Sequence, residues 1–152
     1  MLQAWRMVKG KYAATAFDGE GARRHGGRWN SPGVPVVYTS SSKALAALET
    51  LVHWQWPVPP GFVLIPVGFA EEWVETFPER QLPAGWRGEP PARVSQRIGD
   101  AWTQAGRSVV LALPSVLTGE PNYIINPAHP DFAKLSVGRP EAFVFDPRLW
   151  PR

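Results

Sequence analysis

The chain has 152 residues, of which 44% are apolar and 19% charged, and its formal net charge is +3. This length and apolar content fit one ordinary domain, spanning 1–152, that buries enough surface to fold alone, and they exclude a disordered chain. The 17 prolines and 14 glycines exclude a helical bundle, while the absence of cysteine excludes a disulfide framework and a thiolate nucleophile.

The N-terminus and the charge distribution restrict the compartment and the partners. The first residues lack the apolar segment of a signal peptide and no apolar run approaches the length of a membrane span, so we expect a cytoplasmic protein outside the membrane. Basic residues are scattered rather than gathered in one run, which disfavours direct nucleic-acid binding. The arginines Arg23, Arg24 and Arg28 instead suit a small phosphate-bearing ligand.

The first part of the chain predicts two strands and one helix around a basic loop. Residues 2–8 alternate loosely and predict an opening strand, and 34–39 predict a second strand between clusters of turn residues. Between them, 19–30 contain four glycines and predict a glycine-rich loop. A helix follows from Ser41 or Ser42, because serine is a good N-cap and the next residues favour helix.

This predicted helix carries one carboxylate at the edge of its apolar face. At about 100° per residue, Glu49 lies roughly 40° around the axis from Leu45, on the same side as Val52. The predicted apolar stripe consists of Ala44, Leu45, Leu48, Leu51 and Val52. A carboxylate bordering such a stripe costs free energy unless it is functional or paired. Glu49 is therefore a candidate functional residue, and an ion pair with Arg28 or Lys43 is the alternative.

The second part of the chain predicts four further strands and a second helix. Residues 62–69 predict a strand with Pro66 at an edge or bulge, and 73–77 extend it or pair with it. Proline-rich residues 81–91 predict a loop, and apolar residues at helical spacing predict a helix over 92–104. The remaining predicted strands are 108–113, 123–125 and 142–145. The pattern predicts a single α+β domain with a mostly antiparallel, split or strongly bent sheet and flanking helices.

A second group of candidates lies in the loop and at the strand end. Gly26 and Gly27 can adopt backbone angles that other residues avoid, which lets a ligand approach the main chain, and Arg28 follows them directly. We therefore predict that Gly27 and Arg28 bind a ligand; the alternative is a surface turn in which Arg28 forms a salt bridge. Tyr38 ends a strand, where its ring either packs in the core or stacks on a nucleotide ring.

The C-terminal part adds one hydroxyl and few further candidates. Ser115 follows a strand but lacks the partners of a triad nucleophile, so it either bonds a ligand or caps a turn. Asn126 precedes a proline and predicts a turn, and His129 after it is an acid–base candidate or a structural loop histidine. His25, His53 and His129 have no metal-ligand spacing, and no metal is predicted. The glycines do not form a Walker or Rossmann loop.

Several short motifs occur together along the chain. They are W-R at Trp5-Arg6, F-D-G-E-G-A-x-x-x-G-G-R-W-N over 17–30, V-V-Y-T-S, A-L-A-A-L-E, L-P-S over 113–115 and N-Y-I-I-N-P-x-H-P-D-F. Together they resemble the RES-domain family, toxins of bacterial type II toxin–antitoxin systems that are named for an arginine, a glutamate and a serine. On this chain the three positions match Arg28, Glu49 and Ser115. The resemblance spans 5–146.

The resemblance implies a fold similar to that of ADP-ribosyltransferase toxins, with NAD as the substrate in a cleft of the sheet and with no cofactor or metal. Members consume NAD by hydrolysis or phosphorolysis of the nicotinamide–ribose bond, and some transfer ADP-ribose to a protein. By this resemblance Arg28 binds the phosphate or ribose side of NAD, Tyr38 stacks on nicotinamide and Glu49 orients the ribose. Ser115 supports the catalytic site. The further residues expected to line the NAD site are Arg6, Gly27, Trp29, Asn30 and Asn126.

The resemblance also implies a protein partner, a helix-turn-helix antitoxin of the Xre type that covers the active site. This chain has no DNA-reading motif, so operator binding would belong to the partner. The acceptor of ADP-ribose, which is water, phosphate or a protein side chain, stays open, as does the oligomeric state, with a homodimer among the options. The alternatives are an ADP-ribosyltransferase that modifies a cellular protein and a non-catalytic nucleotide-binding module.

Overall fold

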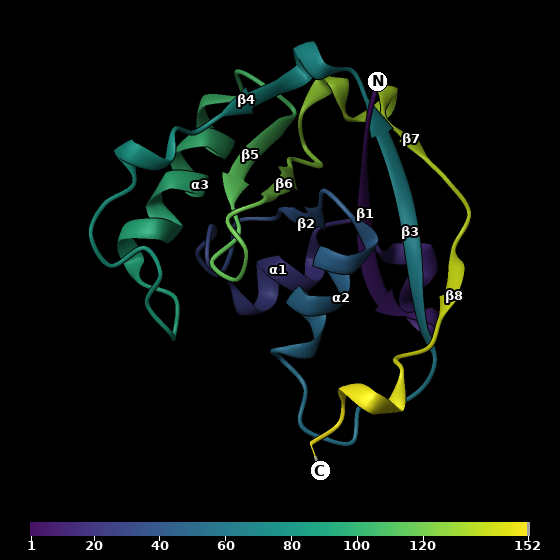
Figure 1. Cartoon of the computed structure of the whole chain (residues 1–152). Coiled ribbons are helices and arrows are strands. Elements are labelled where there is room, and N and C mark those ends of the chain that lie inside the picture. Colours follow the sequence, from purple (N-terminus) through teal and green to yellow (C-terminus); the bar gives the residue numbers. More distant parts are fainter. Residues whose placement is uncertain (152) are drawn as a thin grey trace.

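A computed structural model describes residues 1–151 and shows a curled, mixed β-sheet with flanking helices (Figure 1). The strands are β1 (Leu2–Lys9), β2 (Val37–Ser40), β3 (Phe62–Phe69), β4 (Val74–Thr76), β5 (Val110–Pro114), β6 (Pro121–Ile125), β7 (Ser136–Val137) and β8 (Glu141–Phe143). The α-helices are α1 (Glu20–His25), α2 (Lys43–Leu51) and α3 (Arg93–Ala105). Short 3-10 helices occupy Gly10–Thr15, Glu71–Trp73, Glu79–Gln81, Pro130–Lys134 and Pro147–Leu149. Within residues 1–151, none of the helices combines the length and the apolar character that crossing a membrane requires.

The sheet is continuous but has one narrow joint. Its strand order is β4-β5-β6-β2-β1-β3-β7, and β8 also pairs with β3. β1 and β3 pair antiparallel along their full length, whereas β1 and β2 share only the pair Trp5↔Ser40. Figure 1 shows β1 and β3 on one side of the molecule and β4 and β5 on the other, with α1 and α2 between them. The predicted α+β domain with a mostly antiparallel, bent sheet is confirmed.

The core covers both faces of β5, whose residues are all buried. Successive side chains of a strand point to opposite faces, so alternate residues of β5 serve different clusters. Val110 and Ala112 join a cluster that includes residues of β1 and β3. Leu111 and Leu113 join a second cluster, which contains Trp29, Trp86 and Trp102. We call Trp29, Trp86 and Trp102 the tryptophan cluster.

The predicted basic loop is wrong in its first half, because Glu20–His25 form α1. The charges follow the helix polarity, with Glu20 in the first turn and Arg23 and Arg24 in the last. A Glu20 carboxylate oxygen lies 2.7 Å from Nε of Arg23 and 3.9 Å from Nε of Arg24. Gly19 precedes the helix with a φ of 77°, a conformation that favours glycine. Gly19 and Gly26 therefore mark the two ends of α1, and Gly21 lies inside it.

The apolar stripe predicted for α2 is partly wrong. Leu45 and Ala46 are buried, whereas Leu48 is 43% exposed and Val52, just past the helix end, is 56% exposed. α2 packs against both β1 and β2. The small side chain of Ala46 faces these strands and allows close packing. The helix is therefore rotated relative to the predicted orientation, and Val52 faces a cavity instead of the core.

Two predictions for the strands are also corrected. β4 pairs in parallel with β5 and not with β3, so the pairing predicted for 73–77 is wrong. Pro66 lies inside β3, which has neighbours on both sides, but it falls between the stretches that pair with β7 and with β8. A proline is tolerated there because no neighbouring strand needs its missing N–H. The sequence predicts no strand at Ser136–Val137, which is only two residues long.

α3 packs directly onto the main chain that carries Trp29. A Cβ added to Gly99 would lie 1.6 Å from the carbonyl oxygen of Trp29, so only glycine fits at this crossing. One helical position later, the Asp100 carboxylate accepts hydrogen bonds from the main-chain N of Ser31 at 2.9 Å and from its hydroxyl at 2.6 Å. α3 therefore fixes the segment that follows the glycines.

Replacing Gly99 by Ala should destabilise the protein strongly. The new methyl group cannot share the space of a backbone carbonyl, so α3 and the Trp29 segment must separate and the tryptophan cluster loses packing. We expect the free energy of unfolding to fall by at least about 3 kcal/mol, measured by urea denaturation. Gly21→Ala is the control, because a Cβ at this α1 position meets nothing within 4 Å and Ala favours helix. A Gly99→Ala protein as stable as wild type would contradict this packing.

Candidate active site

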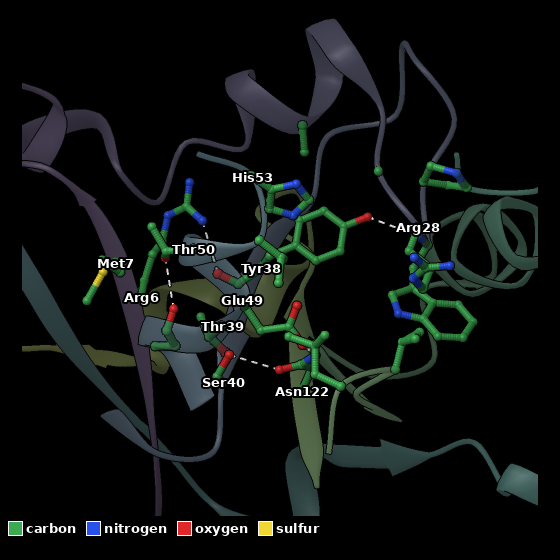
Figure 2. A pocket seen from close by; sticks show the side chains of 18 of the residues that line it. Arg6, Met7, Arg28, Tyr38, Thr39, Ser40, Glu49, Thr50, His53 and Asn122 are labelled. Atoms are coloured by element: carbon green, nitrogen blue, oxygen red, sulfur yellow. Dashed lines mark hydrogen bonds between the residues drawn. The ribbon is translucent and has the colours of Figure 1, made fainter. Parts of the chain in front are cut away.

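A cavity of about 900 Å³ opens beside α2, where β1 and β2 separate. Its walls come from β1, β2 and α2. The first residues after α1 and the loops before α3 and after β5 complete them. Figure 2 shows Arg6, Arg28, Tyr38, Glu49 and Asn122 around this cavity. Three sequence elements that were predicted separately thus meet at one site, and the volume is typical of a small-molecule pocket.

Glu49 is held by two uncharged donors. The Ser115 hydroxyl donates to its Oε1 at 2.6 Å, and the Asn122 amide donates to the same oxygen at 2.9 Å. The ion pairs considered as an alternative do not form: Arg28 pairs with Glu89 and Lys43 with Glu141. Among residues 1–151, Glu49 has no cationic partner within salt-bridge distance. The two family positions Glu49 and Ser115 are therefore brought into direct contact.

Ser115 lies behind Glu49 and is itself fixed on all sides. It is 2% exposed, its main-chain N donates to the carbonyl of Glu120 at 2.8 Å, and its hydroxyl oxygen accepts from the main-chain N of Leu117 at 3.0 Å. Because the oxygen already accepts one bond, the single hydroxyl proton is directed at Glu49. The turn role considered for Ser115 is therefore present, and its hydroxyl is engaged by a carboxylate of the cavity wall.

Tyr38 joins the cavity wall to the segment after α1. Its hydroxyl donates to Oδ1 of Asn30 at 2.5 Å and accepts from the main-chain N of Trp29 at 3.0 Å. A Cβ on Gly27 would lie 2.6 Å from the Tyr38 hydroxyl, so this glycine is required for the approach of Tyr38. Burial raises the pKa of Tyr38 well above its ordinary value, which keeps the phenol protonated and able to donate.

Two residues expected to line the NAD site lie outside the cavity wall. Asn30 is fully buried behind Tyr38, where its amide nitrogen donates to the carbonyls of Ala22 at 2.8 Å and Val34 at 3.0 Å. Asn126 caps a turn, with its side-chain oxygen accepting from the main-chain N of Ala128 at 3.0 Å. Neither contributes to the cavity wall, whereas Arg6, Gly27, Trp29 and Tyr38 do.

Arg28 binds the loop before α3. Its Nη1 donates to the carbonyls of Trp86 at 2.9 Å and Gly88 at 2.8 Å, and its Nη2 lies 2.8 Å from the Glu89 carboxylate. The rings of Trp86 and Trp29 stack with centroids 5.9 Å apart, which holds the same loop against the segment of Arg28. The side chain of Arg28 is 17% exposed and lines the cavity. The salt bridge considered for Arg28 is therefore present, on the cavity wall.

Arg6 is a half-buried cation without a carboxylate partner. Its Nε donates to the carbonyl of Ala16 at 2.6 Å and its Nη1 to the carbonyl of Tyr38 at 3.0 Å. Among residues 1–151, no carboxylate lies within 4.0 Å of its guanidinium. Burial lowers the pKa of Arg6 to about 10, although the more distant Asp18 opposes this shift. The guanidinium remains charged at neutral pH and lines the cavity, which suits it to an anionic ligand group.

The histidines separate into different environments. His129 is structural: its Nδ1 accepts from the main-chain N of Asp131 at 3.0 Å, and its Nε2 lies 3.0 Å from the Gly106 carbonyl oxygen. His53 lines the cavity one helical turn after Glu49, and the exposed His25 lies at the end of α1. Within residues 1–151 no group of three or more His, Cys, Asp or Glu side chains is arranged to hold a metal ion.

Sequence reasoning missed Asn122, His53 and Arg87 as cavity residues. His53 could have been found from its spacing, because residues four apart on a helix share a face with Glu49. Asn122 could not be found in this way, since its contact with Glu49 depends on how β6 pairs with β2.

The fold is that of a toxin from a toxin–antitoxin complex. The chain is similar to one in the crystal structure of the M. tuberculosis MbcT-MbcA toxin-antitoxin complex, with a TM-score of 0.72 and 19% identity over 93% of this chain and 84% of that one. At this level of identity the likeness concerns the fold alone.

The sequence establishes the family. A profile described as RES domain matches residues 3–146, so the chain belongs to the RES domain family, as its motifs indicate. It is 39% identical over 152 residues to the Prs ADP-ribosylating toxin of Sphingobium sp. (strain YBL2), covering 95% of this chain and 94% of that protein. It is 36% identical over 151 residues to Toxin Res of Yersinia enterocolitica serotype O:8, covering 97% of this chain and 99% of that protein.

Replacing Tyr38 by Phe should lower stability in a way that depends on pH. The change leaves the Trp29 N–H and the Asn30 Oδ1 without their partner, which should cost about 1–3 kcal/mol of unfolding free energy at neutral pH. The raised pKa of Tyr38 means that the unfolded chain loses this proton first, so the stability from Tyr38 declines as the pH rises above 10.0. The difference between wild type and variant should therefore shrink in alkali.

Urea denaturation of both proteins at a series of pH values measures this difference. The control is Tyr12→Phe, because Tyr12 is 55% exposed and its loss should leave stability unchanged at neutral pH. A gap between wild type and Tyr38→Phe that stays constant far above pH 10.0 would contradict the burial of the phenol.

Proposed function

We propose that this protein is the toxin of a toxin–antitoxin pair and an enzyme that breaks the bond between nicotinamide and ribose in NAD. The observation that supports this most directly is the separation of charge within one cavity. A carboxylate fixed by neutral donors, Glu49, and a half-buried cation without a carboxylate partner, Arg6, line the same space, with the ring of Tyr38 also in its wall. NAD has an anionic pyrophosphate and a positively charged nicotinamide ring, which match these two sites.

The reaction follows from the chemistry of the carboxylate. The C1′–N bond of the nicotinamide ribose breaks and its electron pair leaves with nicotinamide, so the ribose gains positive charge. Glu49 accepts a hydrogen bond from a ribose hydroxyl and stabilises this charge, which is the electrostatic role expected of a fixed acidic group. An acceptor then forms a bond to C1′ and loses its proton. The protein supplies no covalent nucleophile in this scheme.

The cations and the aromatic ring bind the rest of the substrate. Arg6 would bind a phosphate oxygen of the pyrophosphate, and Arg28 would bind a phosphate or ribose oxygen once Glu89 moves away. Tyr38 would present its ring to nicotinamide, since its hydroxyl is already engaged by Asn30 and Trp29. Ser115 acts through Glu49 and does not itself meet the substrate.

A second candidate is transfer of ADP-ribose to a protein. It is favoured by the name of the Sphingobium relative, a Prs ADP-ribosylating toxin that is 39% identical to this chain. The same cavity residues serve either reaction, and only the acceptor differs. Product analysis separates the cases, because hydrolysis gives free ADP-ribose, phosphorolysis gives its phosphate ester and transfer gives labelled protein.

The toxin needs a neutralising partner, since consumption of NAD would stop growth of its own cell. We propose a helix-turn-helix antitoxin of the Xre type that covers the cavity in the cytoplasm. The likeness to a chain of the M. tuberculosis MbcT-MbcA toxin-antitoxin complex supports an antitoxin partner, and the Xre type is expected from the family resemblance. Expression of this chain without its partner is expected to arrest growth.

Replacing Glu49 by Gln should remove most of the activity. The amide keeps the size of the side chain but not its charge, so the developing cation on ribose loses its stabilisation. We expect NAD consumption, followed by chromatography of nicotinamide, to fall more than about 100-fold. Glu141→Gln is the control, because it is an exposed carboxylate paired with Lys43 outside the cavity. The enzymatic proposal would be refuted if NAD stays intact in the presence of wild-type protein, phosphate and cell lysate.

Replacing Arg6 by Gln should weaken NAD binding more than it slows the reaction. The charge of Arg6 contacts the pyrophosphate in both the ground state and the transition state, so its loss raises KM with a smaller change in kcat. A charge-assisted hydrogen bond of this kind predicts an increase in KM of roughly tenfold or more. Arg107→Gln is the control, because Arg107 is an exposed cation paired with Glu75 away from this cavity. An unchanged KM would remove Arg6 from the binding site.

A further inference from the structure

We propose that Asn122, backed by Ser40, is a positioning residue that aims the carboxylate of Glu49 at the substrate. This inference rests on the proposed function, because it concerns the step in which Glu49 stabilises the ribose. Nothing in the RES name, which refers to an arginine, a glutamate and a serine, assigns a role to Asn122 or Ser40. Their roles follow from a chain of hydrogen bonds that ends on Glu49 (Figure 2).

The chain of bonds leaves one carboxylate oxygen free. The amide nitrogen of Asn122 lies 2.9 Å from Oε1 of Glu49, and the Ser115 hydroxyl lies 2.6 Å from the same atom. Among residues 1–151, no side chain or main-chain group donates to Oε2. Since Glu49 lines the cavity, Oε2 is the oxygen that can accept a bond from a ribose hydroxyl.

Glu49 decides which way the Asn122 amide faces, and the Ser40 hydroxyl completes the arrangement. A carboxylate oxygen accepts and would repel the amide oxygen, so the amide NH₂ faces Glu49. The amide oxygen then faces Ser40, whose hydroxyl donates to Oδ1 of Asn122 at 2.8 Å. The hydrogen bonds therefore run in one direction, from Ser40 to Asn122 and from Asn122 to Glu49.

The sheet holds this series in place. Ser40 and Asn122 are direct partners across β2 and β6, and Asn122 is also paired with Leu113 of β5. Ser40 is in addition the residue that pairs with Trp5 at the joint between β1 and β2. Asn122 thus comes from a strand paired on both sides, while Glu49 comes from α2, so the long Glu49 side chain is held by a hydrogen bond from the sheet.

Neutral donors suit this task better than a cation would. A lysine or arginine in place of Asn122 would also orient Glu49 but would cancel the negative charge that a developing ribose cation needs. An amide and a hydroxyl fix the geometry and leave the charge in the cavity. This accounts for the use of three polar side chains, Ser40, Asn122 and Ser115, where a single ion pair would serve stability alone.

The test compares Asn122→Ala, Ser40→Ala and the double variant in steady-state NAD consumption. Asn122→Ala should lower kcat by about tenfold to a hundredfold, with KM for NAD changing by less than about threefold, because the lost bond orients a group that acts in the transition state. Ser40→Ala should lower kcat by a smaller factor. In the double variant the loss should equal that of Asn122→Ala alone within about twofold, since Ser40 acts through Asn122.

Two further proteins separate positioning from structural support. Asn122→Asp keeps the shape of the side chain but faces Glu49 with a second carboxylate, so its kcat should fall further than that of Asn122→Ala. Ser108→Ala removes a hydroxyl from another side-chain network, between Trp102 and Glu75, and should leave kcat and KM unchanged. Thermal unfolding of each variant shows that it is folded, and Ser40→Ala remains informative if a change at Asn122 prevents folding.

The outcomes that overturn the inference are distinct from those that overturn the proposed function. Wild type that turns over NAD while Asn122→Ala keeps the wild-type kcat would refute the role of Asn122 alone. A loss in the double variant equal to the product of the two single losses would refute the series from Ser40 to Asn122. Wild type that does not turn over NAD would refute the proposed function and this inference together.

Discussion

The single ladder pair between Trp5 and Ser40 is the constraint on which the rest of the structure depends. Because β1 and β2 are joined at only this point, the sheet turns there, and α2 packs against both strands beside the turn. The same rung continues from Ser40 to Asn122 and from Asn122 to Leu113. The bend that opens the cavity and the strand residues that reach Glu49 therefore have one structural origin, so cavity shape and carboxylate orientation cannot vary independently.

The charges of the cavity are arranged for a ligand rather than for each other. Glu49 is satisfied by Ser115 and Asn122, and Arg6 by two main-chain carbonyls, so neither neutralises the other. A fold selected only for stability would gain more from pairing such charges or from replacing them by apolar groups. Two opposite charges that line one cavity without pairing support the proposed function, because ionisable groups in unusual environments cluster at active sites.

The sequence predicted the fold class, most elements and the residues Arg28, Tyr38 and Glu49 that line the cavity. Local patterns predicted each of the three residues: the helix period for Glu49, the end of a strand for Tyr38 and the preceding glycine pair for Arg28. The family resemblance placed Ser115 at the site but predicted no contact with Glu49, and spacing could not reveal this contact because the two residues are distant along the chain. α1 was missed because it is only six residues long and contains a glycine, so propensity argues against it.

Asn30 shows why the remaining site assignments could not be made from sequence. The family resemblance indicated a ligand contact for Asn30, but the main chain turns its amide inward, where it meets carbonyls of α1 and of the segment before β2. Side-chain direction in an irregular segment depends on non-local contacts, here the hydroxyl of Tyr38. Only the periodic elements reveal direction from residue order, and even α2 was partly misjudged, because Ala46 is buried beside Leu45 while Leu48 is exposed.

The contact between Arg28 and Glu89 has a consequence for how tightly a ligand can bind. The guanidinium of Arg28 already forms an ion pair with the carboxylate of Glu89. A phosphate that takes this place exchanges one ion pair for another, so the net gain is the difference between two similar interactions. Arg28 also holds the carbonyls of Trp86 and Gly88 through Nη1, and these bonds are separate from the pair that Nη2 makes with Glu89. The arginine thus stays ordered during such an exchange, and a proposed anionic ligand would gain only moderate affinity from it.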